Sequence, residues 1–183
     1  MKVVFLDRDG VLNQEVHYLC EIRDFSYTDR CVEGLGALRE LGYELIVVTN
    51  QAGIARGYYG ESQYHSLTDW YLNDLSERGI DILDVIHCPH HPEGIVPNFT
   101  FQCSCRKPKP GMLNHMANKH NIEMASSVMV GDKLSDVQAA SAAGVGLRFL
   151  VKTGHPLPQE VEPATCILND MYEVSEYLSS VEI

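Results

Sequence analysis

The sequence predicts an α/β fold with a parallel sheet, and two observations indicate it. Three short apolar runs, Val3–Leu6, residues 44–48 and residues 127–130, are each bounded by turn or polar residues. Such runs are typical of strands that are buried on both faces of a parallel sheet. Stretches with apolar residues at helical spacing lie between them, so strands and helices alternate along the chain.

Length and composition fit one globular domain, which we expect over residues 1–183, since 45% of the 183 residues are hydrophobic and 21% are charged. The formal net charge of −11 argues against nucleic acid as a partner, because proteins that bind nucleic acid carry a basic surface. The first apolar run ends at Asp7, too early for a signal peptide, and no later run approaches membrane-spanning length. We therefore expect a cytoplasmic monomer without membrane partners.

The other elements follow in a regular order. After the first strand, residues 14–28 are polar and aromatic without a helical period, which indicates a loop or flap that covers the site. Helical spacing then begins at Val32 and stops at Gly42. A second helix is expected over residues 62–78, with Ser62 as its N-cap. The rest of the alternation comprises a strand at 84–87, a helix from Pro110, a helix that ends at Gly144, strands at 146–151 and Cys166–Leu168, and a last helix at 171–178.

Two carboxylates, Asp7 and Asp9, come directly after the first strand, and Gly10 turns the chain away from the sheet. Burying acids at a strand end costs free energy, and ligands of open α/β sheets bind at that edge, so the pair indicates a working site. Asp7 is placed to attack a phosphorus atom, and Asp9 to protonate the departing alcohol and later to deprotonate water. The carboxylate oxygens of the pair are also suitable ligands for Mg²⁺. An isolated D-x-D is more often a turn or a helix cap, so this interpretation depends on partners elsewhere in the chain.

The second strand ends in Thr49, Asn50 and Gln51, at the same edge of the sheet as the first. A hydroxyl, an amide and the backbone N–H groups of a turn at Gly53 are suitable donors for phosphate oxygens. A plain polar loop is the alternative. Arg56 either reaches the substrate or remains a solvated surface charge.

The loop after the strand at 84–87 holds soft metal ligands in the pattern C-P-H-x12-C-x-C: Cys88, His90, Cys103 and Cys105. Three sulfurs and one imidazole suit tetrahedral Zn²⁺, which would fasten the loop, residues 88–105. Because all four ligands come from the protein, a structural zinc is expected rather than a catalytic one. His91 is available in place of His90. The alternatives to zinc are unligated cysteines or a disulfide between Cys88 and one of the later pair.

Arg106 and Lys107 follow the last of these cysteines directly. A metal in the loop would hold both residues rigidly in place. A Lys107 ammonium beside Asp7 would neutralise phosphate and orient the nucleophile.

Asp132 is a third acid at a strand end, after the apolar run at 127–130. It is ready to complete Mg²⁺ coordination together with Asp7 and the backbone carbonyl of Asp9. Asp136 either positions the metal ligands without binding the metal itself or caps the helix that follows, and the sequence favours neither role over the other.

The assembled pattern resembles the haloacid dehalogenase (HAD) superfamily of phosphatases. Its four motifs occur in order at strand ends: D-x-D-G at Asp7, T-N at Thr49, R-K-P at Arg106 and G-D-x-x-S-D at Asp132. A second aspartate two residues after the first is associated there with phosphatases rather than dehalogenases. The resemblance implies a three-layer α/β sandwich with a central parallel sheet and a minimal cap, formed by the zinc loop and the flap after Asp9.

Within this superfamily, F-L-D-R-D-G, V-V-T-N-Q-A-G-I-A-R-G, C-P-H-H-P-E-G and C-S-C-R-K-P-K-P-G-M are similar to stretches of the phosphatases that act on a heptose bisphosphate. Histidinol-phosphate phosphatases also have a zinc loop, but with a shorter gap, so the spacing from His90 to Cys103 favours the heptose family. The resemblance implies removal of the C7 phosphate of a sugar bisphosphate through an aspartyl-phosphate intermediate. Histidinol-phosphate phosphatase is the alternative.

The resemblance also assigns roles to matching positions. It implies Asp7 as nucleophile, Asp9 as acid and base, and Asp132 as a ligand of catalytic Mg²⁺, with His90 completing the structural Zn²⁺ site. Thr49 and Lys107 would bind the transferring phosphate. With Arg56 added as a rim cation, the expected substrate contacts are Glu15, Val16, His17, Tyr18, Thr49, Asn50, Gln51, Ala52, Arg56, Arg106, Lys107 and Lys133.

Two other functions are weighed against this one. A non-enzymatic, zinc-stabilised interaction module would be expected to have lost a catalytic group. None is missing, since Asp7, Asp9, Thr49, Lys107 and Asp132 are all present. A nucleic-acid 3′-phosphatase would use the same chemistry, but the acidity of the chain disfavours it.

Overall fold

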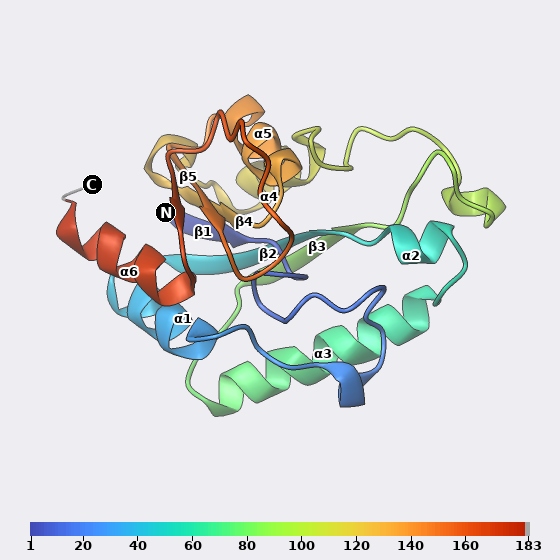
Figure 1. Ribbon diagram of the computed structural model, residues 1–183, viewed down its shortest axis with the longest axis horizontal. Coiled ribbons are helices and arrows are strands. Elements are labelled where there is room, and N and C mark those ends of the chain that lie inside the picture. The colour runs from blue at the N-terminus through green and yellow to red at the C-terminus, as the bar shows by residue number, and fades with distance from the viewer. Residues whose placement is uncertain (182–183) are drawn as a thin grey trace.

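A computed structural model describes residues 1–181 and confirms the parallel sheet (Figure 1). Among these residues the sheet has the strand order β3-β2-β1-β4-β5-β6, and every neighbouring pair is parallel. Beside β1 the register aligns Val3 with Glu44 and Val4 with Val128. The strands are β1 (Val3–Leu6), β2 (Glu44–Asn50), β3 (Asp84–Cys88), β4 (Val128–Gly131), β5 (Leu147–Val151) and β6 (Cys166–Leu168).

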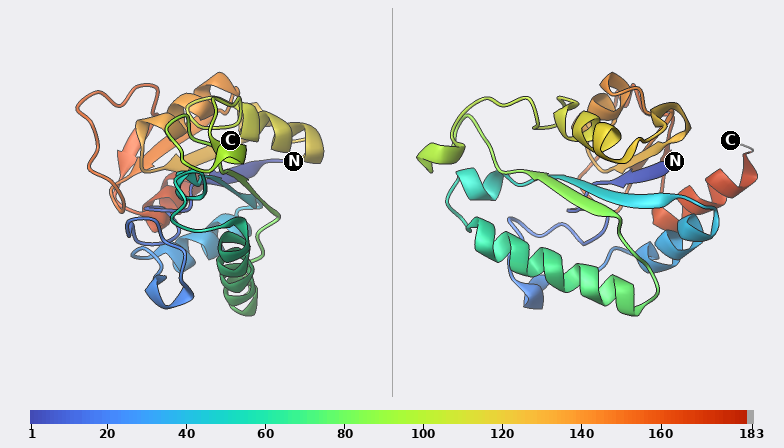
Figure 2. Two further views of the ribbon diagram at one scale, coloured as in Figure 1. Left: turned by 90° about the vertical axis from the view of Figure 1, so that its right-hand side faces the viewer. Right: turned by 180° about the vertical axis from the view of Figure 1, so that it is seen from behind.

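Helices cover both faces of the sheet, which confirms the three-layer sandwich (Figure 2). Successive side chains of a strand point to opposite faces, so Val4 packs in one core with α1, α3 and α6, while Phe5 packs in a second core with α4 and α5. In the part of the chain that the structure describes, no helix is both long and apolar enough to cross a membrane. The helices are α1 (Cys31–Glu40), α2 (Ala52–Ala55), α3 (Glu61–Glu77), α4 (Gly111–His120), α5 (Leu134–Ala142) and α6 (Met171–Ser180), with single 3-10 turns at Ile22–Asp24, Pro97–Phe99 and Met124–Ser126.

The strand order determines where the site forms. The chain runs outward from β1 in both directions, to β2 and β3 on one side and to β4, β5 and β6 on the other. A crevice therefore opens at the carboxyl end of β1, between β2 and β4. In Figure 1 this edge faces the right-hand side, where α2 and the loop after β3 project.

Two local predictions are wrong. Gly60, not Ser62, is the N-cap of α3, because the Gln63 side chain accepts the Gly60 N–H at 3.1 Å and starts the helix one residue earlier. The expected turn at Gly53 is the short helix α2. Glycine is required there for packing, since a Cβ would lie 2.2 Å from the Tyr59 ring.

Candidate active site

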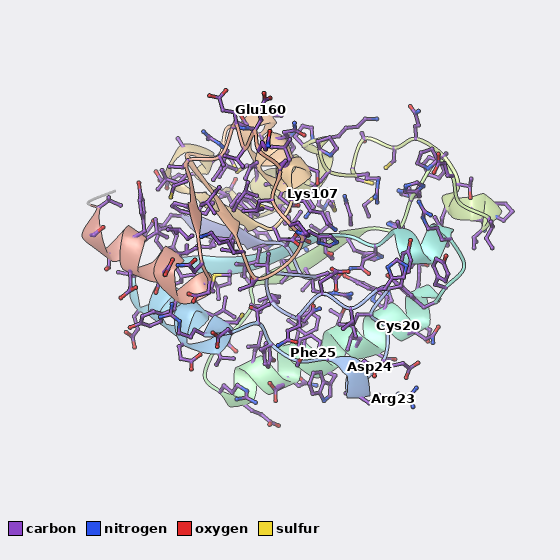
Figure 3. All side chains as sticks on the ribbon, in the orientation of Figure 1. Cys20, Arg23, Asp24, Phe25, Lys107 and Glu160 are labelled. Carbon is purple, nitrogen blue, oxygen red and sulfur yellow. The ribbon has the colours of Figure 1, made fainter. Side chains whose placement is uncertain are left out.

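Three buried acids, Asp7, Asp132 and Asp136, gather at the carboxyl ends of β1 and β4. Each offers a carboxylate oxygen, and these oxygens lie within 4.8 Å of one another. Lys107 Nζ lies 3.1 Å from Asp7 Oδ1, 2.7 Å from Asp136 Oδ1 and 2.7 Å from the Val48 carbonyl oxygen. Lys107 is buried, and its label lies near the middle of the view in Figure 3. The structure thus brings the expected lysine to the expected nucleophile.

Asp136 combines the two roles that the sequence leaves open. Its Oδ2 accepts the Lys133 N–H at 3.0 Å at the start of α5. Its Oδ1 also holds Lys107, whose Nζ pairs with Asp7 as well. The same carboxylate therefore begins the helix and holds Lys107.

The acid cluster carries more negative charge than Lys107 can neutralise. Burial, opposed by Lys107 and reinforced by Asp136 and Asp9, raises the pKa of Asp7 to about 6. Burial and the charge of Asp7 also raise the pKa of Asp132. Asp132 Oδ1 is buried and has no hydrogen-bond partner among residues 1–181. Buried carboxylate oxygens in excess of their cations fit a hard divalent ion.

A second set of donors holds the side chain of Asp9. Arg8 Nη2 lies 2.9 Å from Oδ1 and 3.0 Å from Oδ2, Asn13 donates at 3.1 Å, and Gln51 donates at 3.0 Å. Burial alone would raise the pKa of Asp9, but Arg8 first, and then Asn13 and Gln51, bring it below its ordinary value. Arg8 is only 1% exposed and also donates to the Leu19 carbonyl at 3.2 Å. The candidate acid and base is thus connected to the flap.

The end of β2 supports the site through its side chains. Asn50 makes two hydrogen bonds of 3.0 Å to the backbone N–H and carbonyl of Lys107. Gln51 Nε2 donates to Thr49 Oγ1 at 2.8 Å, and the Tyr59 hydroxyl donates to Gln51 Oε1. Asn50 therefore positions the lysine segment, and Tyr59 fixes the orientation of the Gln51 amide.

A cavity of about 400 Å³ opens above these groups. Thr49 is fully buried at the end of β2 and lies outside the cavity wall. Every other expected substrate contact lies in the wall: Glu15, Val16, His17, Tyr18, Asn50, Gln51, Ala52, Arg56, Arg106, Lys107 and Lys133.

Cationic groups from two segments meet in one part of the cavity wall. Arg56 Nη2 lies 3.3 Å from His91 Nε2, and Arg106 belongs to the same wall. Burial, Arg106 and Arg56 lower the pKa of His91. Arg56 Nε and Arg106 Nη1 are buried without a hydrogen-bond partner among the described residues. Free guanidinium donors around a cavity are suited to an anion.

The four soft ligands of the 88–105 loop converge on one point. Cys88 Sγ lies 3.5 Å from Cys103 Sγ and 3.2 Å from Cys105 Sγ, and His90 Nδ1 lies 3.3 Å from Cys105 Sγ. These separations are far longer than a disulfide bond of about 2.05 Å and are close to the roughly 3.8 Å ligand spacing of tetrahedral zinc thiolates. The cysteines are free, which argues against the disulfide alternative. The ring of His91 lies in the cavity wall instead, so the geometry selects His90.

Several residues that shape the site were not predicted from the sequence. Arg8 and Asn13 hold Asp9, and Tyr59 holds Gln51. His155 touches Asp132 from the segment after β5. A signal exists only for Arg8, as a charged residue at the end of a buried strand between two acids. The others lie in loops where no pattern marks them.

A parallel sheet with buried acids and a lysine at the point where the strand order reverses is the arrangement of HAD-like hydrolases. The HAD-hydrolase-like family model matches residues 104–174 of this chain. The chain is 55% identical over 178 residues to D-glycero-alpha-D-manno-heptose-1,7-bisphosphate 7-phosphatase of Photorhabdus laumondii, covering 97% of both chains. It is 45% identical to D-glycero-beta-D-manno-heptose-1,7-bisphosphate 7-phosphatase of Yersinia pestis, covering 97% of this chain and 95% of that one.

Structural similarity agrees with these relatives. D,D-heptose 1,7-bisphosphate phosphatase from B. bronchiseptica, solved with magnesium and phosphate, superposes with a TM-score of 0.83 at 30% identity. The superposition covers 98% of this chain and 99% of that one. The chain therefore belongs to the heptose-1,7-bisphosphate 7-phosphatase family of HAD-like phosphoric monoester hydrolases. The alternative assignment to the histidinol-phosphate phosphatases is not supported.

Proposed function

We propose that this chain removes the C7 phosphate of D-glycero-D-manno-heptose 1,7-bisphosphate and releases heptose 1-phosphate, a step toward nucleotide-activated heptose. The observation that carries the proposal is a cavity lined by two groups of residues that are each suited to a phosphate. Asp7 and Lys107 line the cavity as an ion pair at 3.1 Å, and Arg56 and Arg106 line it as well. A sugar with a phosphate at each end matches both.

Asp7 acts as the nucleophile. One of its carboxylate oxygens bonds to phosphorus while the bond from phosphorus to the C7 oxygen breaks, and Asp9 gives a proton to that oxygen. Asp9 then takes a proton from water as the water oxygen attacks phosphorus, which frees phosphate and restores Asp7. Lys107, held by Asp136, stabilises the negative charge on the phosphoryl oxygens throughout.

The hydrogen bonds to Asp9 suit its change from acid, when the alcohol leaves, to base, when water attacks. Arg8, Asn13 and Gln51 lower the pKa of Asp9, which makes it a carboxylate before substrate enters. A phosphate arriving beside that carboxylate favours its protonated form, because like charges repel. Substrate binding thus prepares the acid, and departure of the alcohol restores the base.

Mg²⁺ is the proposed catalytic cation, with Asp7, Asp132 and the backbone carbonyl of Asp9 as its ligands. Two observations support this assignment: Asp132 Oδ1 is buried without a hydrogen-bond partner in the described part of the chain, and the cluster has an excess of negative charge. When bound, Mg²⁺ would screen the repulsion between Asp7 and the phosphate and favour ionised Asp7.

Zn²⁺ is the proposed structural metal, held by Cys88, His90, Cys103 and Cys105. The Arg106 N–H lies 3.4 Å from Cys103 Sγ, so the metal site would fix the segment that delivers Arg106 and Lys107. Free thiol ligands require a reducing compartment, which supports a cytoplasmic location. Because the proposed nucleophile, acid and base, and phosphate-binding cations all belong to one chain, we also propose that the monomer is active.

The rim cations would bind the phosphate that does not react. Arg56 and Arg106 have buried donors to spare, and Lys133 adds a further cation to the wall. Binding energy from this remote phosphate can orient the reacting end, so a substrate that lacks it should lose kcat as well as affinity. Histidinol phosphate, with a cationic amine in place of the second phosphate, should be repelled by this rim.

The relatives suggest the anomer. The 55% identical relative is named for the α anomer, and the Yersinia relative, at 45%, is named for the β anomer. We therefore propose the α anomer as the preferred substrate.

A phosphate-release panel tests these proposals. It compares kcat/KM for the α and β anomers of heptose 1,7-bisphosphate, heptose 7-phosphate, histidinol phosphate and a 3′-phosphorylated oligonucleotide, and NMR identifies the product. We expect the α bisphosphate to be the best substrate and heptose 1-phosphate to be the product. A higher kcat/KM for histidinol phosphate, or heptose 7-phosphate as product, would overturn the substrate assignment while leaving the chemistry at Asp7 standing. A higher kcat/KM for the β anomer would overturn the anomer assignment alone.

A further inference from the structure

His155 reaches the acid cluster from the segment that joins β5 to β6, and neither a sequence motif nor the proposed mechanism uses it. Its backbone N–H donates to Asp132 Oδ2 at 2.9 Å, and its ring Nδ1 lies 2.6 Å from the same oxygen. A carboxylate acceptor at that distance places the ring proton on Nδ1. One residue thus supplies two donors to one oxygen of Asp132.

The two residues before His155 hold the segment against the end of β1. The Thr153 hydroxyl donates to the Gly10 carbonyl at 2.7 Å. Gly154 leaves room for the acid, because a Cβ there would lie 2.1 Å from Asp132 Oδ2. Gly10 does the same from the loop after β1, where a Cβ would lie 2.3 Å from that oxygen. The Asp132 carboxylate is therefore packed closely against the backbone of two glycines and held by His155.

We propose that His155 is a positioning residue for Asp132, and the proposal rests on the Mg²⁺-dependent function above. By occupying Oδ2, the imidazole fixes the rotation of the carboxylate and leaves Oδ1, buried and without a partner among residues 1–181, available to a cation. Hydrogen bonds to metal ligands typically contribute 10- to 100-fold to metal affinity. The side chain of His155 should contribute to Mg²⁺ affinity on this scale. A substitution tests the side chain alone, because the backbone N–H remains in any variant other than proline.

A direct contact with substrate is the competing role, since the His155 side chain is 35% exposed and lies in the cavity wall. The two roles predict different measurements. A positioning residue changes Mg²⁺ affinity in the absence of substrate. A substrate contact changes KM for the sugar phosphate at saturating Mg²⁺ and leaves metal affinity unchanged.

The experiment is calorimetric titration of Mg²⁺ into zinc-loaded, magnesium-free protein without substrate. His155→Ala should weaken Mg²⁺ binding about 10- to 100-fold. His155→Asn, whose side-chain amide can donate from the position of Nδ1, should recover most of that loss. His115→Ala, at an exposed histidine of α4, is the matched control and should bind Mg²⁺ as the wild type does.

Urea unfolding of each variant shows whether it is folded. Unchanged Mg²⁺ affinity in folded His155→Ala, or a loss in His155→Asn as large as in His155→Ala, would overturn the proposal. Wild-type protein that does not bind Mg²⁺ would instead overturn the metal-dependent function on which the proposal rests. If His155→Ala fails to fold, the His155→Asn titration decides, and a loss of affinity greater than about tenfold in that folded variant overturns the proposal.

Discussion

Replacement of Asp7 by asparagine should abolish turnover and stabilise the folded protein at the same time. An amide is not a nucleophile at phosphorus, so the covalent route is lost. The substitution also removes a buried charge. Asparagine keeps the Oδ1 that accepts the Arg8 N–H at 2.8 Å, and Lys107 keeps its ion pair with Asp136.

The size of the stabilisation follows from the pKa of Asp7, which rises from 3.8 to about 6 on folding. At about 1.4 kcal/mol per pH unit, ionising this carboxyl in the folded, magnesium-free protein costs up to about 3 kcal/mol. Below pH 3.8 the group is protonated in both the folded and the unfolded chain, so it contributes no penalty. As pH rises toward 6 the unfolded chain ionises first and stability falls, and above about 6 the full cost applies.

The assay is urea unfolding at pH 7.5 without Mg²⁺, followed by the fluorescence of the single tryptophan, Trp70. Asp7→Asn should be more stable than the wild type by up to about 3 kcal/mol, which corresponds to a rise in Tm of roughly 2–4 °C per kcal/mol. Asp69→Asn, at an exposed position of α3, is the control and should change neither stability nor turnover. The stability difference should shrink as the pH is lowered from 6 toward 4, because the wild type then gains its proton.

Two results would refute this reasoning. Near-normal turnover in a purified Asp7→Asn sample would remove the covalent mechanism. A variant less stable than the wild type at pH 7.5 would show that the contacts of the ionised carboxylate outweigh the cost of burying it.

Asp9→Asn should lower kcat by about 10²- to 10⁴-fold, because both formation and hydrolysis of the aspartyl phosphate become slower. Rapid-quench measurement of the aspartyl phosphate can separate the two steps. An unchanged kcat would exclude Asp9 as acid and base. Cys105→Ser should lose zinc, of which the wild type is expected to hold roughly one per chain. The substitution should lower activity by a larger factor than it lowers stability to unfolding. Elemental analysis that finds no zinc in the wild type would contradict this prediction. Burial, and after it the charge of His65, lowers the pKa of His87 from 6.5 to about 4. As the pH drops from 6.5 to 4, the histidine is therefore protonated in the unfolded chain before it is protonated in the folded protein, and stability should fall. His87→Gln should reduce that fall, on the order of 1–2 kcal/mol after solvent screening, and urea midpoints with the same pH dependence in both proteins would contradict it.

The sequence by itself predicted the order of strands and helices and the candidate residues of the site. Apolar runs that end at Asp7, Thr49 and Asp132 predict parallel strands, and the carboxyl ends of parallel strands share one edge. The spacing of three cysteines and a histidine predicts a metal loop, because few other arrangements bring soft ligands together at such intervals. These features are local, so short windows of sequence contain them.

The tertiary structure decided which partners those residues have. Lys107 contacts Asp136 as well as the expected Asp7, and His155 holds Asp132, although neither of these added contacts joins neighbours in sequence. Such contacts depend on the order of the strands and on the loops that leave them, which periodicity does not encode. The same holds for the choice of His90 over His91, where adjacent residues of one type differ only in the direction that folding gives their rings.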